Sequence, residues 1–297
     1  MSILSIQNIS KSYGNIKALN GVSFEVPQGA IFGVLGPNGS GKTTLLSIIV
    51  DVLKADNGNF LWFDQPGSPG TRRQIGTLLE TPNFYHYLSA FNNLKITNSI
   101  SGRGNINEIN VVLEKVKLLE RKDSRFSTYS LGMKQRLAIA GALLGEPKVL
   151  VLDEPTNGLD PVGIAEIREL IKELSIAGHT IIMASHLLDE VEKVCTHVAI
   201  LKKGTLITTG SVDDVLVDND IVEISANDNN ALLNILQSYN GNEQVILENG
   251  FVQIHLAKGT ARPEEINAFC FSKGITLNHL VIKKKRLEAK FFELTNN

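Results

Sequence analysis

Residues 36–44 read Gly36-Pro37-Asn38-Gly39-Ser40-Gly41-Lys42-Thr43-Thr44. This stretch matches the pattern G-x-x-x-x-G-K-[S/T], whose glycines let backbone N–H groups face phosphate oxygens. The apolar run at residues 31–35 predicts a buried strand before the loop, and residues 43–53 predict a helix after it. In this arrangement Lys42 reaches the β and γ phosphates of a nucleotide, and the Thr43 hydroxyl can ligate Mg²⁺. The alternative is an ordinary glycine turn, which the flanking strand and helix disfavour.

The chain before this loop predicts a pair of antiparallel strands. Residues 3–9 and 21–26 alternate apolar and polar side chains, and Tyr13-Gly14-Asn15 between them is typical of a turn. The middle third of the chain is predicted to be helical, because residues 107–119 and 133–144 repeat apolar side chains at helical spacing.

Two strongly apolar runs follow, at residues 149–152 and 180–184, and residues 162–177 between them predict a helix that ends at Gly178. Buried runs joined by helices are typical of a parallel sheet. The first run continues into Asp153 and Glu154. Two carboxylates at a strand end suit metal-assisted hydrolysis, with Asp153 holding Mg²⁺ through water and Glu154 beside an attacking water.

The pattern of apolar and polar residues changes after about residue 215. Residues 216–297 predict a second, smaller α+β module. Asn249-Gly250 is a two-residue hairpin signal, and Pro263 opens a helix that closes at Gly274. The predicted order β-α-β-β-α-β, typical of a ferredoxin-like or split-βαβ module, covers residues 221–225, 231–237, 244–248, 251–256, 263–274 and 276–282. A last helix is predicted at residues 287–294.

Composition narrows the class of protein. The 297 residues contain 29 Lys+Arg and 31 Asp+Glu, a formal net charge of −2, which disfavours nucleic-acid binding. Cys195 and Cys270 have no metal-binding or redox spacing, so two buried thiols are expected. The chain carries no secretory signal pattern and no apolar run of about 20 residues, so we expect a cytoplasmic protein.

Several short motifs, in their order along the chain, resemble the ATP-binding subunits of ATP-binding cassette (ABC) transporters over about residues 1–215. Residues 36–44 resemble the Walker A loop, and residues 149–154 resemble Walker B. The stretch Tyr129-Ser130-Leu131-Gly132-Met133-Lys134-Gln135-Arg136 resembles the signature loop that distinguishes this family. Residues 155–160 resemble the D-loop, and Ala184-Ser185-His186 resembles the switch histidine after its strand.

The resemblance implies the fold, the cofactors and the site. The fold is a phosphate-loop ATPase with a mixed sheet core, an antiparallel N-terminal β-subdomain and a helical subdomain at about residues 84–145. The cofactors are ATP and Mg²⁺. The resemblance implies that Glu154 and His186 are catalytic and that Thr43, Asp153 and Glu80 bind Mg²⁺. The implied ATP contacts are Tyr13, Gly36, Pro37, Asn38, Gly39, Ser40, Gly41, Lys42, Thr43, Thr44, Ser130, Gly132 and Asp160.

Simpler interpretations stay open for several of these residues. Tyr13 is implied to stack on adenine but could only pack in its hairpin. Ser130 and Gly132 precede a helix, where serine is a common cap as well as part of an anion site. His186 alone could be a structural or surface histidine. The aromatic residues 83–94 could form either an interface with the membrane subunit or part of the core.

The sequence departs from the usual family pattern in two motifs. Leu131 and Met133 replace a glycine and a glutamine of the signature, and Glu80 stands where a Mg²⁺-touching glutamine is usual. Both departures resemble the bacitracin-type and lantibiotic-immunity export branch. They also leave open a regulatory subunit with little hydrolysis, because a carboxylate at Glu80 would repel the γ-phosphate.

The resemblance implies an ATPase that powers export through separately encoded integral membrane permease subunits. In the ATP-bound state two identical chains pair head to tail, so that the signature of one chain meets the γ-phosphate bound by the other. The protein would lie on the inner face of the membrane and touch it only through its partner. A different class of function also fits, a soluble ABC-type switch that acts on cytosolic partners, although such proteins usually carry two cassettes and basic linkers.

Overall fold

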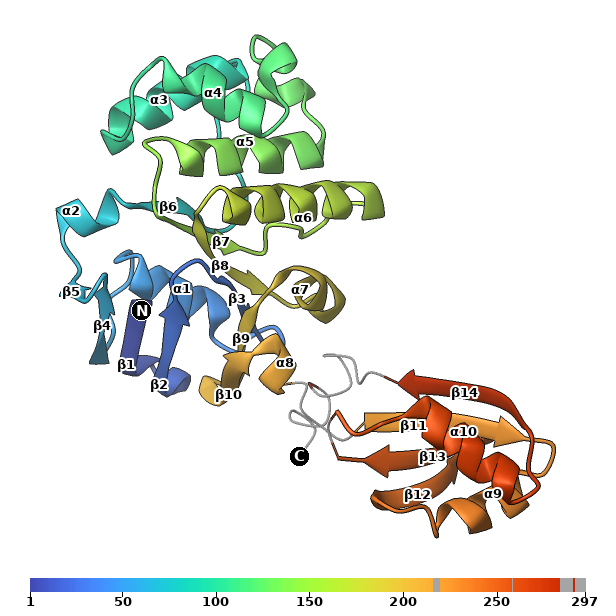
Figure 1. The fold of residues 1–297 in the computed structure, drawn as a ribbon. Helices are drawn as coiled ribbons and strands as arrows, with labels where there is room; N and C mark the ends of the chain where they lie inside the picture. The colour runs from blue at the N-terminus through green and yellow to red at the C-terminus, as the bar shows by residue number, and fades with distance from the viewer. Residues whose placement is uncertain (216–219, 258, 284–290, 292–297) are drawn as a thin grey trace. The chain divides into compact units, whose positions relative to one another are not determined.

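The computed structural model describes residues 1–215, 220–257, 259–283 and 291. They form two compact units, residues 1–212 and 213–297 (Figure 1). Apart from Phe291, the helix predicted at residues 287–294 lies outside the described residues.

The first unit begins with an antiparallel sheet in the order β2-β1-β4-β5. The predicted hairpin is confirmed: Tyr13 pairs with Ile16 at its tip. Both strands are longer than the alternation suggested, because register shifts let pairing continue past Ile9. The strands are β1 (Ser2–Tyr13), β2 (Ile16–Pro27), β4 (Asn57–Trp62) and β5 (Gln65–Pro66).

A second sheet of six strands has the order β10-β9-β3-β8-β7-β6. Its strands are β3 (Ile31–Leu35), β6 (Ile75–Leu78), β7 (Val149–Asp153), β8 (Thr180–Ser185), β9 (His197–Lys202) and β10 (Thr205–Ser211). Five of them are parallel, and β10 is antiparallel to β9, so the sheet is mixed as expected. Strand β6 was not predicted, since four residues are too few for a periodic signal.

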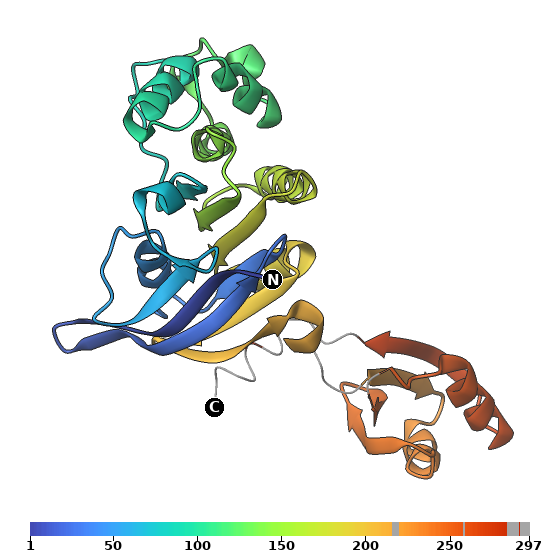
Figure 2. The ribbon, with the colours of Figure 1, turned by 60° about the vertical axis from the view of Figure 1, so that its left-hand side comes forward.

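The helices of this unit cover the mixed sheet and build the predicted helical subdomain. Helix α1 ends earlier than predicted, because Asp51 takes the left-handed conformation (φ 65°). Figures 1 and 2 show α3 and α4 as a group beside α5. The helices are α1 (Lys42–Ile49), α2 (Pro69–Arg72), α3 (Ala90–Ser101), α4 (Glu108–Lys115), α5 (Leu131–Leu143), α6 (Pro161–Ile176), α7 (Leu188–Val194) and the 3₁₀ turns Leu119–Arg121 and Phe126–Thr128.

One hydrophobic core joins the two sheets of the first unit to helix α1. It combines Leu4 and Trp62 of the antiparallel sheet, Leu45 and Ile48 of α1, and Val151 of β7, each at most 1% exposed. The Trp62 indole donates to the Ile49 carbonyl at 2.7 Å, which satisfies its buried N–H. The helix behind the phosphate loop is therefore packed on both sides.

The second unit forms the predicted β-α-β-β-α-β module. Its sheet is antiparallel with the order β12-β13-β11-β14, which is the ferredoxin-like order. Asn249 (φ 49°) and Gly250 (φ 82°) form the expected hairpin turn. Helix α8 (Val212–Val215) begins at the end of the first unit, and the module itself has β11 (Asp220–Ala226), α9 (Asn229–Leu236), β12 (Asn242–Glu248), β13 (Phe251–Leu256), α10 (Pro263–Ser272) and β14 (Leu277–Lys283).

Within the described part of the chain, every helix is too short or too polar to span a bilayer. The thiols of Cys195 and Cys270 are free and buried, as predicted.

Replacing Gly76 by alanine should destabilise the first unit. A Cβ added to this β6 residue would lie 2.2 Å from the Ala142 carbonyl of α5, so strand and helix would have to separate. We expect a loss of about 1–3 kcal/mol, the usual cost of overpacking, measured as a lower urea midpoint. The matched control is Gly70→Ala, where an added Cβ would meet nothing closer than 3.7 Å. Equal midpoints for the two variants would show that the close approach does not matter.

Candidate nucleotide-binding and catalytic site

The predicted catalytic and phosphate-binding residues meet at the carboxyl edge of the mixed sheet. The phosphate loop follows β3, Asp153 ends β7, His186 follows β8, and Glu80 follows β6 by two residues. Parallel pairing aligns these ends, since Leu35 pairs with Ser185 and Asp153 pairs with Ala184. Ligands of open α/β sheets bind at this edge.

The phosphate loop needs glycine where the backbone is crowded. Gly41 has a φ of 102°, and a Cβ there would lie 2.4 Å from the Ala18 carbonyl. Residues 37–39 are exposed, while Ser40 and Lys42 are buried. The loop therefore turns its backbone outward at the start of α1, where an anion would meet free N–H groups and the positive end of the helix dipole.

Glu154 links the two halves of the site. Its carboxylate lies 3.7 Å from the Lys42 ammonium and 2.8 Å from Nδ1 of His186. Its backbone takes the left-handed conformation (φ 47°) and its amide donates to the Ala184 carbonyl at 3.0 Å. This turn directs the carboxylate to the sheet edge. Motif order placed the three residues in one site, but nothing in the sequence indicated that Lys42 and Glu154 contact each other.

Asp153 is the buried acid of the site, only 3% exposed. Burial raises its pKa, and the neighbouring Glu154 and Glu80 raise it further, while a hydrogen bond from Thr43 and the charge of Lys42 oppose the rise. Its Oδ1 atom has no hydrogen-bond partner among the described residues. A buried carboxylate oxygen without a donor, next to a threonine hydroxyl, fits a hard cation.

These oxygen ligands fit a Mg²⁺ ion whose coordination shell is completed by water and phosphates better than they fit a metal bound by protein ligands alone. Among the described residues no group of three His, Cys, Asp or Glu could bind an ion by itself. Mg²⁺ usually takes one or two protein ligands and completes its shell with water and substrate phosphates. Thr43 and Asp153 offer such a pair. Glu80 is exposed, has a φ of 61°, and lies near enough for its charge to act on Asp153.

The signature and D-loop residues contact each other within one chain. Ser130 caps α5 by accepting from the Met133 amide at 3.2 Å, and Asp160 caps α6 by accepting from Gly163 at 2.8 Å. The Leu131 side chain lies against Gly158, where an added Cβ would be 3.2 Å from it. The unusual leucine of the signature therefore packs on the D-loop, and Ser130 stays exposed beside it.

The residues of the aromatic segment differ in their burial. Phe84 is half-buried and packs edge-on against the buried Phe126, with 5.3 Å between the ring centroids, so it takes part in the packing of the helical subdomain. Tyr85 and Tyr87 are 50% and 69% exposed. Tyr13 is 49% exposed, and the Lys11 ammonium lies over one face of its ring, 5.9 Å from the ring centroid.

Comparison with known proteins agrees with this geometry. Residues 19–157 match the ABC transporter family model. The chain is 36% identical to an ABC transporter ATP-binding protein of Bacillus subtilis, over 99% of this chain and 96% of the relative. The chain belongs to the ABC transporter ATP-binding family. This cassette is therefore an ATPase of the kind that is coupled to transport.

The cassette also resembles proteins of known role and structure. It is 34% identical to a bacitracin transport ATP-binding protein of Bacillus licheniformis, over 99% of this chain and 97% of the relative. The ADP conformation of the ATP-binding cassette MJ1267 superposes with a TM-score of 0.66 at 29% identity, over 72% of this chain and 92% of that one. A dimeric structure of the cassette MJ0796 with ADP and phosphate superposes with a TM-score of 0.63 at 25% identity. The match covers 70% of this chain and 98% of that one.

Replacing Asp153 by asparagine should stabilise the nucleotide-free cassette at pH 7. A raised pKa means that the folded state holds this proton more tightly than the unfolded chain, so stability falls as pH rises between the unfolded and the folded pKa. At pH 7 the full cost is present, and Asp153→Asn removes it. We expect the Tm of the first unit to rise by about 2–4 °C, the shift for about 1 kcal/mol.

The gain should shrink as the pH falls from 7 through the raised pKa of Asp153, and it should vanish below the usual pKa of aspartate, where both states are protonated. Asp160→Asn is the control, because asparagine caps a helix as well as aspartate does. An unchanged or lower Tm for Asp153→Asn at pH 7 would contradict the account of Asp153 as a strained buried charge.

Proposed function

We propose that this cassette binds Mg-ATP between two identical chains that pair head to tail, and that it hydrolyses the ATP there. The observation that carries the proposal is the convergence of Lys42, Asp153, Glu154 and His186 at one sheet edge. Ser130 and Leu131 are exposed at the start of α5, so a second chain can reach them. A solved relative, the cassette MJ0796, is a dimer with ADP and phosphate.

The residues of the site bind different parts of Mg-ATP. Lys42 and the loop amides bind the β and γ phosphates, and Tyr13 stacks on the adenine. Mg²⁺, held by Thr43 and Asp153 with Glu80 nearby, would neutralise charge that develops on the phosphates. Glu154 accepts a proton from the attacking water.

His186 positions this base. Its Nδ1 already lies 2.8 Å from Glu154, and its exposed ring can turn toward the γ-phosphate. A phosphate that binds Lys42 competes with Glu154 for the ammonium group, which frees the carboxylate for water. The ATP-free contact between Lys42 and Glu154 therefore suppresses the base until nucleotide arrives.

We further propose that the cassette works on the inner face of the membrane with separate membrane-spanning permease subunits and drives export. The support is its similarity over nearly its whole length to a bacitracin transport ATP-binding protein, and over 213 residues to a lantibiotic transport ATP-binding protein at 39% identity. We assign no role to the second unit.

Glu154→Gln should keep ATP binding and lose turnover. The amide removes the base but keeps the size of the side chain, so we expect steady-state phosphate release to fall by about 10²–10⁴-fold while the ATP Kd changes little. Size-exclusion chromatography with ATP should show accumulated dimers. Lys42→Ala is the contrasting variant, which should lose nucleotide affinity. Normal turnover in Glu154→Gln would remove Glu154 as the base.

Affinity isolation of the tagged protein from gently solubilised native membranes tests the partner. We expect a multi-span membrane protein to co-purify at a near one-to-one ratio, identified by mass spectrometry. Recovery only from the soluble fraction, together with ribosomal or other cytosolic proteins, would favour the soluble ATP switch instead.

A further inference from the structure

Leu131, which stands where the signature usually has a glycine, lies on the D-loop of its own chain (residues 155–160). Leu131 is 46% exposed, yet its Cδ2 atom lies 3.2 Å from the position that a Cβ on Gly158 would take. Gly158 has a φ of 74°, a conformation that favours a residue without a side chain. The space that a side chain would fill at Gly158 is therefore bordered by the leucine.

A second leucine makes the contact between the two loops reciprocal. Leu159 of the D-loop has its Cδ2 atom 4.0 Å from the position of a Cβ on Gly132 of the signature. Each leucine therefore lies beside a glycine of the other loop. We call these two contacts, Leu131 with Gly158 and Leu159 with Gly132, the leucine–glycine interlock.

An ion pair extends the link along the two helices that begin at the interlock. Arg136, in the second turn of α5, lies 3.5 Å from Glu166 of α6, measured between Nη2 and Oε2. The Arg136 side chain is mostly buried, although Glu166 is half exposed. The starts of α5 and α6 are therefore joined at two levels.

The far end of α5 is held by the sheet and by the helical subdomain. Near its C-terminus the Ala142 carbonyl lies against Gly76 of β6. Gly145, just beyond the helix, donates through its amide to a carboxylate oxygen of Glu108 at 3.1 Å. A helix of 13 residues spans about 20 Å. A force on the start of α5 therefore passes to the residues beside that start, because the other end resists sliding.

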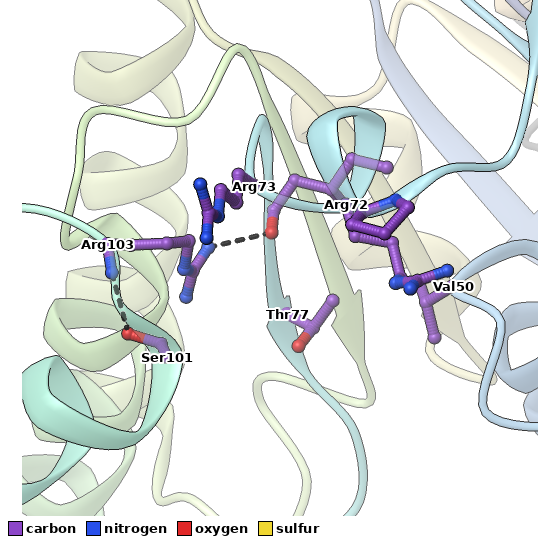
Figure 3. Close-up of a pocket in the computed structure, with 8 residues that line it drawn as sticks. Val50, Arg72, Arg73, Thr77, Ser101 and Arg103 are labelled. Carbon is purple, nitrogen blue, oxygen red and sulfur yellow. Dashed lines mark hydrogen bonds between the residues drawn. The ribbon is translucent and has the colours of Figure 1, made fainter.

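An arginine also ties the helical subdomain to β6. Arg103 donates through Nη1 to the Ile75 carbonyl at 2.7 Å, and it lines a pocket together with Arg72 and Arg73 (Figure 3). This hydrogen bond joins the subdomain to the same strand on which α5 packs. It therefore adds to the resistance at the far end of α5.

The start of α5 is where the partner's nucleotide would act in the head-to-tail dimer. The Ser130 side chain accepts from the Met133 amide, and the Leu131 and Gly132 amides before it have no acceptor within the helix. Free amides at a helix N-terminus bind an anion such as a γ-phosphate. Leu131 thus offers its backbone N–H to the partner's ATP and its side chain to its own D-loop.

The D-loop leads directly from the interlock to the catalytic base. The Asn157 amide donates to the Glu154 carbonyl at 3.1 Å, and the Leu159 amide donates to the Thr156 carbonyl at 3.3 Å. Two consecutive turns leave this loop little slack, so a shift of Gly158 also displaces the backbone at Glu154. Chains of packed side chains and hydrogen bonds of this kind carry coupling between sites.

We propose that Leu131 is a positioning residue that couples the two ATP sites of the dimer. ATP bound by the partner acts on the start of α5, Leu131 passes the displacement to Gly158, and the D-loop brings Glu154 of the same chain into position for hydrolysis. This inference rests on the proposed function, which supplies the dimer. With a glycine in place of Leu131, no side chain would connect the signature to Gly158.

The first test shortens the leucine. Leu131→Ala should lower kcat by at least about fivefold, the lower end of coupling between two sites, because the contact with Gly158 is lost. The ATP Kd of the isolated chain and the urea midpoint should stay unchanged, since Leu131 is half exposed and faces the partner's nucleotide. Leu131→Met can still reach Gly158 and should restore most of the rate. Leu247→Ala is the matched control, a leucine of the second unit that is 47% exposed, and should keep the wild-type rate.

The second test uses mixed dimers to show which chain's base depends on Leu131. One chain of each dimer carries Glu154→Gln, so that only the other chain hydrolyses its ATP, and two different tags isolate the mixed species. Phosphate release is followed over a single turnover. We expect slow release when Leu131→Ala is in the chain that keeps Glu154, and normal release when Leu131→Ala is in the chain with Glu154→Gln.

The outcomes separate coupling from direct contact and from the proposed function. A leucine that only touched the partner's ATP would give the reverse pattern, because the signature of the Glu154→Gln chain meets the ATP that is hydrolysed. That pattern, equal rates in both arrangements, or a wild-type rate in the Leu131→Ala homodimer would overturn the proposal and leave the ATPase assignment in place. If the wild-type protein neither dimerises with ATP nor hydrolyses it, the proposed function fails and the coupling fails with it.

Discussion

A buried positive charge organises this cassette. The Lys42 ammonium is almost fully removed from water, and a charge in that position must be paired or hydrogen-bonded. The Gly36 carbonyl at 2.8 Å and the Glu154 carboxylate at 3.7 Å supply the partners. One partner lies in the phosphate loop and the other follows β7, so the same charge ties the loop to the catalytic strand. The fold places it there through packing of α1 between the two sheets.

The acidic side of the site is held under electrostatic strain. Asp153 is buried beside Glu154 and within reach of Glu80, and its Oδ1 has no donor among the described residues. Natural sequences break local rules of polar satisfaction at functional sites and compensate elsewhere. Here the compensation is the large shared core, and the Oδ1 atom of Asp153 is left available to a cation. The buried acids therefore lower the stability of the nucleotide-free cassette and raise its affinity for the cation.

Much of the fold and of the site could be predicted. The strand–loop–helix around Gly36–Thr44, strands β7 and β8, and the β-α-β-β-α-β order at residues 220–283 follow from periodicity, apolar runs and turn residues, which are local signals. Of the strands that were not predicted, β5 and β6 have only two and four residues, whereas β4, β9 and β10 are longer. Strand β6 has four residues, and its glycine is explained only by the Ala142 carbonyl of α5 that lies against it. The order of residues along the chain does not indicate that β6 and α5 approach each other so closely.

Residue types and their spacing were enough to name the chemistry, because phosphate binding, metal ligation and general base catalysis each require particular side chains in a particular local conformation. The tertiary structure was needed for everything that depends on which elements become neighbours. It brings Glu154 to Lys42 across residues far apart in the chain, packs Leu131 of the signature on Gly158, and collects Arg72, Arg73 and Arg103 around one pocket. Burial and charge proximity are properties of three-dimensional packing, so the pKa of Asp153 and the pairing of these charges arise only when the sheets and helices have assembled.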